Sequence, residues 1–144
     1  MVHYMKKVKP LYYIGATISL FFGIWHFFVP YLYDWFLYIP SYENLVVGIE
    51  YTNFFFSLLL SGLSILLIAL GRKFFAGSKD VLIFYGLLVF TWLCRAAITF
   101  IIPWPLEPIR WAAYGQQIAA FAVFLFLLIP FVYQASSHRK SRAK

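Results

Sequence analysis

Residues 44–70 read NLVVGIEYTNFFFSLLLSGLSILLIAL, an apolar stretch with a single charged residue, Glu50. Gly71, Arg72 and Lys73 follow it and end it. A helix of about 20 apolar residues crosses the roughly 30 Å hydrocarbon core of a bilayer. The stretch therefore predicts a transmembrane helix, and it decides the class of the protein.

Three further stretches have the same character, at about residues 11–29, 81–102 and 109–133. Pro30 closes the first, and a proline-rich segment separates the last two. Of the 144 residues, 63% are hydrophobic and 12% are charged, and the mean hydropathy is +0.80. An ordinary soluble domain is only about 45–50% apolar. The composition therefore predicts a protein that needs lipid.

These four spans predict an all-α domain over residues 1–135, an integral membrane antiparallel four-helix bundle. The antiparallel order follows because short connections make consecutive helices neighbours of opposite direction. Residues 136–144 are polar and basic, and we expect them to form a disordered cytoplasmic tail.

The formal charge of +7 is distributed by side of the membrane. One side would carry three groups of basic residues, and the other would carry only Arg110. Cytoplasmic loops are enriched in Lys and Arg, so we expect both termini inside the cell and a location in the cell membrane. The charge then marks topology, and nucleic acid is not expected as a partner. The basic groups are Lys6, Lys7 and Lys9, then Arg72, Lys73 and Lys79, then Arg139, Lys140, Arg142 and Lys144.

Polar side chains gather at the outer ends of the spans. Charged residues within a span are rare because each costs roughly 2.5–3.5 kcal/mol at the helix centre. Glu50 and Arg95 would both lie about 9–11 Å below the outer boundary, at 1.5 Å rise per residue. Each span contributes at least one polar side chain to this layer. The candidate ligand-binding residues are His26, Glu50, Asn53, Arg95 and Gln116.

Small residues at four-residue spacing predict helix contacts rather than ligand groups. On the first span these are Gly15, Ser19 and Gly23, and on the second they are Ser57, Ser61 and Ser64, on the same face as Asn53. Thr91 and Thr99 share a face with Arg95. Cys94 is expected to be a small buried apolar residue.

Several kinds of chemistry are not indicated. One cysteine excludes an intramolecular disulfide and dithiol redox chemistry. His26 is the only histidine expected at membrane depth, so no metal or haem site is predicted. The sequence contains no phosphate loop, nucleophile elbow or nucleotide fingerprint, and no cofactor is evident beyond the quinone class that would suit an apolar site.

The first two spans resemble the DoxX-like group of small four-helix bacterial membrane proteins. The resemblance rests on Gly15, on residues 23–27 (GIWHF) followed by Pro30, and on Glu50 opening a span that runs through Gly62 to a basic stop. It implies the four-helix architecture. It also implies an association with membrane redox functions, since one such protein is a subunit of a thiosulfate:quinone oxidoreductase. Arg95 has no counterpart in the resemblance.

Two functions remain open from the sequence. In the first, the polar layer is a site where Arg95 holds an oxygen of a small hydrophobic or amphipathic ligand, quinone- or lipid-like, and Glu50 and His26 handle a proton or hydrogen bond. In the second, the protein is a non-catalytic membrane subunit or anchor, and Glu50 pairs with Arg95 only to specify helix packing. Its basic tails would bind anionic lipid or a protein partner, another copy of the chain included. A small transporter ranks last because matched repeats are lacking.

Overall fold

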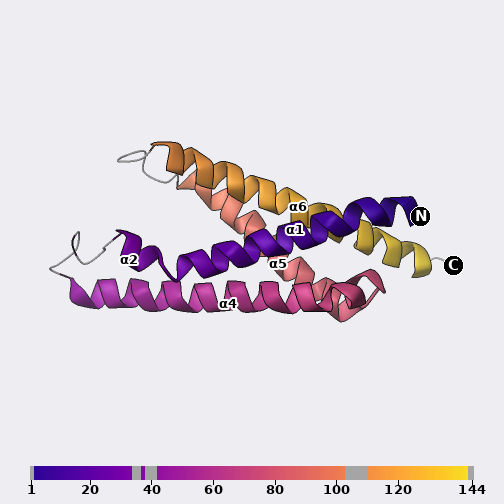
Figure 1. Cartoon of the computed structure of the whole chain (residues 1–144), viewed down its shortest axis with the longest axis horizontal. Helices are drawn as coiled ribbons and strands as arrows, with labels where there is room; N and C mark the ends of the chain where they lie inside the picture. Colours follow the sequence, from indigo (N-terminus) through magenta and orange to yellow (C-terminus); the bar gives the residue numbers. More distant parts are fainter. Residues whose placement is uncertain (1, 34–36, 38–41, 103–109, 143–144) are drawn as a thin grey trace.

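The computed structural model describes residues 2–33, 37, 42–102 and 110–142. Within these ranges the chain is helical and contains no strand. Figure 1 shows these helices, most of which run along the length of the molecule. Their bounds are α1 Val2–His26, α2 Val29–Tyr33, α4 Glu43–Phe75, α5 Lys79–Ile101 and α6 Arg110–Arg142.

Three helical segments are long and apolar enough to cross a membrane: Glu43–Phe75, Lys79–Ile101 and Tyr114–His138. They correspond to the second, third and fourth spans predicted from the sequence. The segment α1 is not among them. Its first third contains Lys6, Lys7 and Lys9, and its apolar part ends at His26, which leaves a shorter apolar stretch than in the other three.

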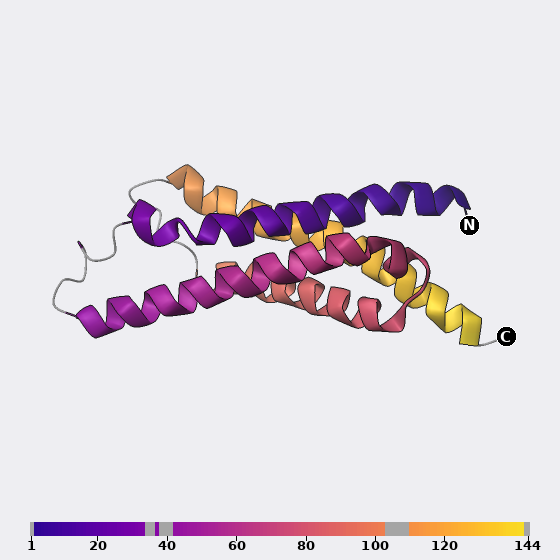
Figure 2. The same cartoon turned by 60° about the horizontal axis from the view of Figure 1, so that its bottom comes forward.

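The long helices pack as a ring, in the order α1, α4, α5, α6 and back to α1. α1 packs against α4 and α6, and α5 packs against the same two helices. The start of α1, the α4–α5 turn and the last turns of α6 lie at one end of the molecule in both views (Figures 1 and 2). We call this the basic end, because Lys7, Lys9, Arg72, Lys73 and Lys79 belong to those segments.

The α4–α5 turn has a specific backbone geometry. Gly77 has a φ of +86°, a conformation that L residues with a side chain rarely adopt. The amide of Gly77 donates to the carbonyl of Phe74, and the amide of Ser78 donates to that of Lys73, each at 3.0 Å. These bonds satisfy carbonyls left open at the end of a helix, and they allow α5 to start after only three residues.

The core near the basic end is aromatic. Tyr12 and Tyr85 are fully buried and stacked, with ring centroids 4.7 Å apart, and the Tyr12 hydroxyl donates to the Leu67 carbonyl at 2.6 Å. Phe74 packs on both rings. This end of the molecule is filled by side chains.

Small residues bring the helices close together, as the sequence predicted. A Cβ on Gly23 would lie 2.8 Å from the backbone nitrogen of Ser61, and a Cβ on Gly15 would lie 2.9 Å from Leu127 Cδ2. Ser19 and Ser64 are fully buried, and their hydroxyls are 3.0 Å apart. The predicted stripes on the first two spans are therefore packing surfaces.

Two expectations about helix ends are wrong. The first helix was expected to run to Val29 and to be closed by Pro30, but α1 ends at His26, where Phe27 and Phe28 form a turn on the carbonyls of Ile24 and Trp25. Pro30 lies in the first turn of α2, where an amide hydrogen has no intrahelical partner to lose. The tail was expected to be disordered, but α6 continues to Arg142.

The continuation of α6 has a physical reason. No glycine or proline interrupts residues 131–142, and basic residues are favourable at a helix C-terminus because they complement its partial negative charge. Gln134 is buried and lies with His138 beside Gly77 of the α4–α5 turn. The proline-rich segment expected to separate the third and fourth spans, with Pro103, Pro105 and Pro108, lies outside the described residues.

Candidate functional site

Asn53 joins the end of α1 to α4. Its Nδ2 donates to the backbone carbonyl of His26 at 2.5 Å, and its Oδ1 lies 3.2 Å from His26 Nδ1. His26 is the last residue of α1, so its carbonyl has no partner within the helix. The His26 ring also packs edge-on against Phe56, with centroids 5.0 Å apart. Two predicted site residues are thus brought into direct contact.

Arg95 and Gln116 join α5 to α6. An Nη atom of Arg95 donates to Gln116 Oε1 at 3.0 Å, and both side chains are half-buried. The partner is a neutral amide. Across the part of the chain that the structure describes, no carboxylate oxygen lies within 4.0 Å of the Arg95 guanidinium.

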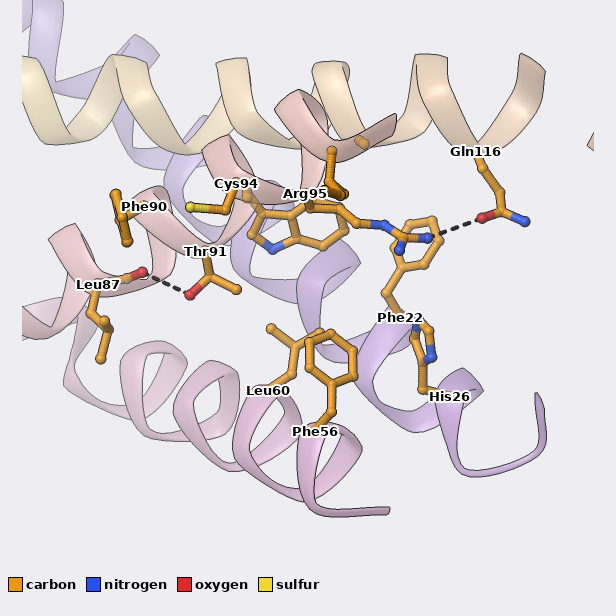
Figure 3. A pocket seen from close by; sticks show the side chains of 13 residues that line it. Phe22, His26, Phe56, Leu60, Leu87, Phe90, Thr91, Cys94, Arg95 and Gln116 are labelled. Atoms are coloured by element: carbon orange, nitrogen blue, oxygen red, sulfur yellow. Dashed lines mark hydrogen bonds between the residues drawn. The ribbon is translucent and has the colours of Figure 1, made fainter. Parts of the chain in front are cut away.

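A cavity of about 560 Å³ lies against Arg95, and we call it the Arg95 cavity. All four long helices contribute to it, and apolar and aromatic side chains form most of its wall. Figure 3 shows Arg95 extended toward Gln116, with His26, Phe22 and Phe56 beneath. Its lining residues are Phe22, His26, Phe56, Leu60, Leu87, Phe90, Thr91, Trp92, Cys94, Arg95, Ile98, Gln116 and Ala120.

Trp92 fixes the inner wall of the Arg95 cavity. Its indole Nε1 donates to the Ser19 hydroxyl at 2.9 Å, and the Ser64 hydroxyl donates to the same oxygen at 3.0 Å. This buried contact ties together α1, α4 and α5. A buried Trp needs a partner for its N–H, so the contact sets the orientation of the ring. Trp92 lies about one helical turn from Arg95 along α5, on the side of the basic end.

Glu50 lies in a different place from Arg95. It lines a groove of about 450 Å³ with Phe27, Tyr31 and Asn53, and it does not line the Arg95 cavity. No ion pair forms between the two charged side chains, both of which are described. The direct Glu50–Arg95 contact weighed from the sequence is therefore absent from this structure.

A third hollow, of about 660 Å³, lies between these two sites. His26, Asn53 and Arg95 line it together with the first turns of α4. Four of the five predicted residues, all except Glu50, therefore line the Arg95 cavity or this hollow, and His26 and Arg95 line both.

Sequence reasoning missed several residues of the site. Cys94 was expected to be buried, but it is exposed and lines the Arg95 cavity, because α5 turns that side of the helix toward the gap beside α4. Thr91 was placed on the face of Arg95, and that periodicity was a usable signal. The aromatic residues Phe22, Phe56 and Trp92 carried no such signal, since aromatic side chains occur throughout the spans.

The chemistry available at the Arg95 cavity is hydrogen bonding to oxygen. A guanidinium offers five N–H donors in a fixed fork, an amide offers two, and an imidazole offers one or two. Among the residues that the structure describes, no three His, Cys, Asp or Glu side chains come together in a way that could hold a metal ion. The arrangement fits recognition of an oxygen-bearing group at one end of an apolar space.

Fold and site together define the class of the protein. It is an all-helical protein with three helices long and apolar enough to cross a membrane, and it carries an apolar cavity with an arginine at one end. Comparisons with protein families, with curated proteins and with solved structures found no match to this chain.

Proposed function

We propose that this chain is a four-helix integral membrane protein, with both termini in the cytoplasm, whose Arg95 cavity binds a small hydrophobic or amphipathic ligand of the quinone or lipid kind. The observation that carries the proposal is the composition of the cavity: one polar end, formed by Arg95, Gln116 and His26, in a wall that is mostly apolar and aromatic. Ligand sites of about 300–1,000 Å³ with a few convergent polar groups have this form.

The outer surface of the helices supports a membrane location. Large apolar side chains are exposed along the four long helices; for example, Leu59 is 71% exposed, Ile83 70% and Ile118 70%. Soluble monomers rarely expose contiguous apolar patches beyond a few hundred Å². A surface of this kind favours contact with lipid over contact with water.

The orientation rests on charge. The basic end carries Arg72, Lys73 and Lys79 at the α4–α5 turn, together with Lys7 and Lys9 of α1. The positive-inside rule places such an end in the cytoplasm, and the Arg95 cavity then lies toward the outer face. A fourth span requires α1 to cross with the other three helices, and its contacts with α4 and α6 favour this.

Topology is tested with reporter fusions. Green fluorescent protein fused after Lys144 should fluoresce, whereas alkaline phosphatase fused there should be inactive. Alkaline phosphatase inserted between α5 and α6 should be active. An active phosphatase at the C-terminus would contradict the proposed orientation.

Roles at the site follow from the contacts. Arg95 binds an oxygen of the ligand, and Gln116 holds the guanidinium in place. His26, oriented by Asn53, supplies a second hydrogen-bonding group. A redox role for the ligand rests on the DoxX-like resemblance of the first two spans.

Ligand binding is tested by extraction. The protein is purified in a mild detergent, and organic extracts are analysed by mass spectrometry. We expect a hydrophobic molecule to accompany the native protein and Arg72→Ala, which removes an exposed arginine at the basic end, and to be lost from Arg95→Ala and Arg95→Gln. Circular dichroism confirms that each variant is folded. An empty native protein, or equal ligand in all four proteins, would contradict the proposal.

A further inference from the structure

We infer that the ligand of the Arg95 cavity is a single-chain amphiphile with an anionic oxygen headgroup, carboxylate or phosphate, whose chain lies in a groove between α4 and α5 and which enters sideways from the bilayer. The inference rests on the proposed function, and it specifies the charge, the shape and the route of the ligand.

The charge of the headgroup follows from the surroundings of Arg95. Its guanidinium bonds only to the neutral amide of Gln116 among the described residues, and Glu50 lines a separate groove. A charge held away from water is costly unless it is paired. A neutral quinone carbonyl would accept a hydrogen bond but leave the positive charge uncompensated. A carboxylate or phosphate supplies the charge and matches the planar fork of donors.

The single chain follows from a second hollow. A groove of about 520 Å³, which we call the α4–α5 groove, runs from the Arg95 cavity toward the basic end. It shares Phe56, Leu60, Leu87 and Thr91 with the cavity, so the two adjoin each other.

The rest of the α4–α5 groove is apolar, with Leu63, Leu66 and Phe84 in its wall. Among the described residues of the lining, Thr91 has the only side-chain hydroxyl, and it donates to the Leu87 carbonyl at 3.0 Å within its own helix. The groove therefore offers no free donor to a polar group. It suits an alkyl or isoprenoid chain, and the polar end of the same molecule would lie at Arg95.

The route follows from the open side of the cavity. Leu87 is 53% exposed and Phe90 is 60% exposed, although both line the cavity. Figure 1 shows α4 and α5 close together at their turn and diverging toward the other end. Leu87 and Phe90 thus line the cavity and also face the outside of the bundle, where lipid chains lie in a membrane. A ligand already dissolved in the bilayer can enter there without crossing water.

The charge is tested with a quenching probe. The protein is placed in nanodiscs of phosphatidylcholine, and its tryptophan fluorescence is titrated with dibrominated stearic acid or with the methyl ester of the same acid. Bromine quenches nearby indoles, and Trp92 lines the cavity. We expect the acid to bind about ten- to a hundredfold more tightly than the ester, the range for a hydrogen bond to a charged group. Trp92→Phe should remove most of the saturable quenching.

Gln116→Glu provides an isosteric control. It places a carboxylate at the position of the amide oxygen, 3.0 Å from the guanidinium, so the protein itself supplies the countercharge. We expect the preference for the acid over the ester to disappear in Gln116→Glu and in Arg95→Gln, and to persist in Arg72→Gln. Competition by oleate against a lysophosphatidate of equal chain length then shows whether a carboxylate or a phosphate is the better headgroup.

The groove is tested with two glycines that have open space around them. A Cβ on Gly62, which lines the α4–α5 groove, or on Gly115, which lies beside the cavity residue Gln116 without lining the cavity or the groove, would meet no atom within 4 Å. Gly62→Leu should fill the groove and weaken binding of the long-chain acid about tenfold, with little effect on an acid of half the length. Gly115→Leu should change neither.

The possible results distinguish a failure of the inference from a failure of the proposed function. Equal binding of acid and ester by the native protein would overturn the anionic headgroup and leave a hydrophobic ligand standing. Unchanged binding by Gly62→Leu would overturn the chain position. No saturable quenching by either probe, together with an empty extract, would overturn both the inference and the proposed function.

Discussion

Asn53 of α4 holds the end of α1 by bonding to both the backbone and the ring of His26. The amide donates to the carbonyl at 2.5 Å, and its oxygen lies 3.2 Å from Nδ1. The terminal carbonyls of a helix otherwise need water or a capping group as a hydrogen-bond partner. Water is scarce inside an apolar protein. One side chain thus caps α1 from a neighbouring helix and aims the imidazole toward the Arg95 cavity.

Replacing Asn53 with alanine should weaken the α1–α4 contact. Hydrogen bonds between helices in membrane proteins contribute about 0.6 kcal/mol on average and up to about 1.7 kcal/mol. We expect Asn53→Ala to lower the free energy of unfolding by about 1–2 kcal/mol, measured by titration with denaturing detergent and circular dichroism. Asn44→Ala is the matched control, since Asn44 is exposed on the same helix. Equal losses in the two variants would contradict a specific role for Asn53.

Gly23→Ala should force α1 away from α4. The new Cβ would lie 2.8 Å from Ser61 N and 3.1 Å from Ser61 Cα, and backbone atoms cannot rotate aside. Overpacking of this kind costs about 1–3 kcal/mol. Gly62→Ala on α4 meets nothing within 4 Å, so it should gain about 0.5–1 kcal/mol from helix propensity. Thermal unfolding in detergent compares them, and a stabilised Gly23→Ala would refute the close approach.

The Ser19–Trp92 bond predicts coupled mutational effects. Ser19→Ala and Trp92→Phe each remove the same hydrogen bond, so their effects on unfolding should not add. We expect a coupling energy of about 0.5–1.5 kcal/mol in a double-mutant cycle. Thr91→Val is the control, because its hydroxyl bonds within α5 and its effect should add to that of Ser19→Ala. An additive Ser19–Trp92 pair would show that the bond contributes nothing.

Cys94 reports occupation of the cavity. Because its thiol is exposed and lines the Arg95 cavity, we expect complete labelling by a pyrene maleimide in detergent, and at least about tenfold slower labelling with saturating dibrominated stearic acid. Ala97→Cys in a Cys94→Ala background is the control, since Ala97 is exposed on α5 and does not line the cavity. Its rate should be insensitive to the acid. A Cys94 that resists the reagent would contradict the structure.

Much of the local structure could be predicted from residue order alone. The run at 44–70 lies within α4, and the run at 81–102 lies within α5 except for its last residue, because a long apolar run has few other ways to satisfy its backbone. The small-residue stripe of Gly15, Ser19 and Gly23 lies at helix contacts, since helical periodicity places such residues on one face. The end of α1 was misplaced because proline was taken as the stop, whereas the chain turns at Phe27 and Phe28 and uses Pro30 to start α2.

The composition of the site depended on the tertiary structure. Depth along a helix is readable from sequence, and it put Glu50 and Arg95 at one level, but the rotation of each helix about its axis and the angle at which neighbours cross are set by packing. That rotation sends Glu50 into its own groove, joins His26 to Asn53 and Arg95 to Gln116, and exposes Cys94. The sequence by itself determined which helices form and which polar residues they carry. Only the packing of α1, α4, α5 and α6 decided which of those residues face one cavity, because that choice depends on contacts between segments far apart in the chain.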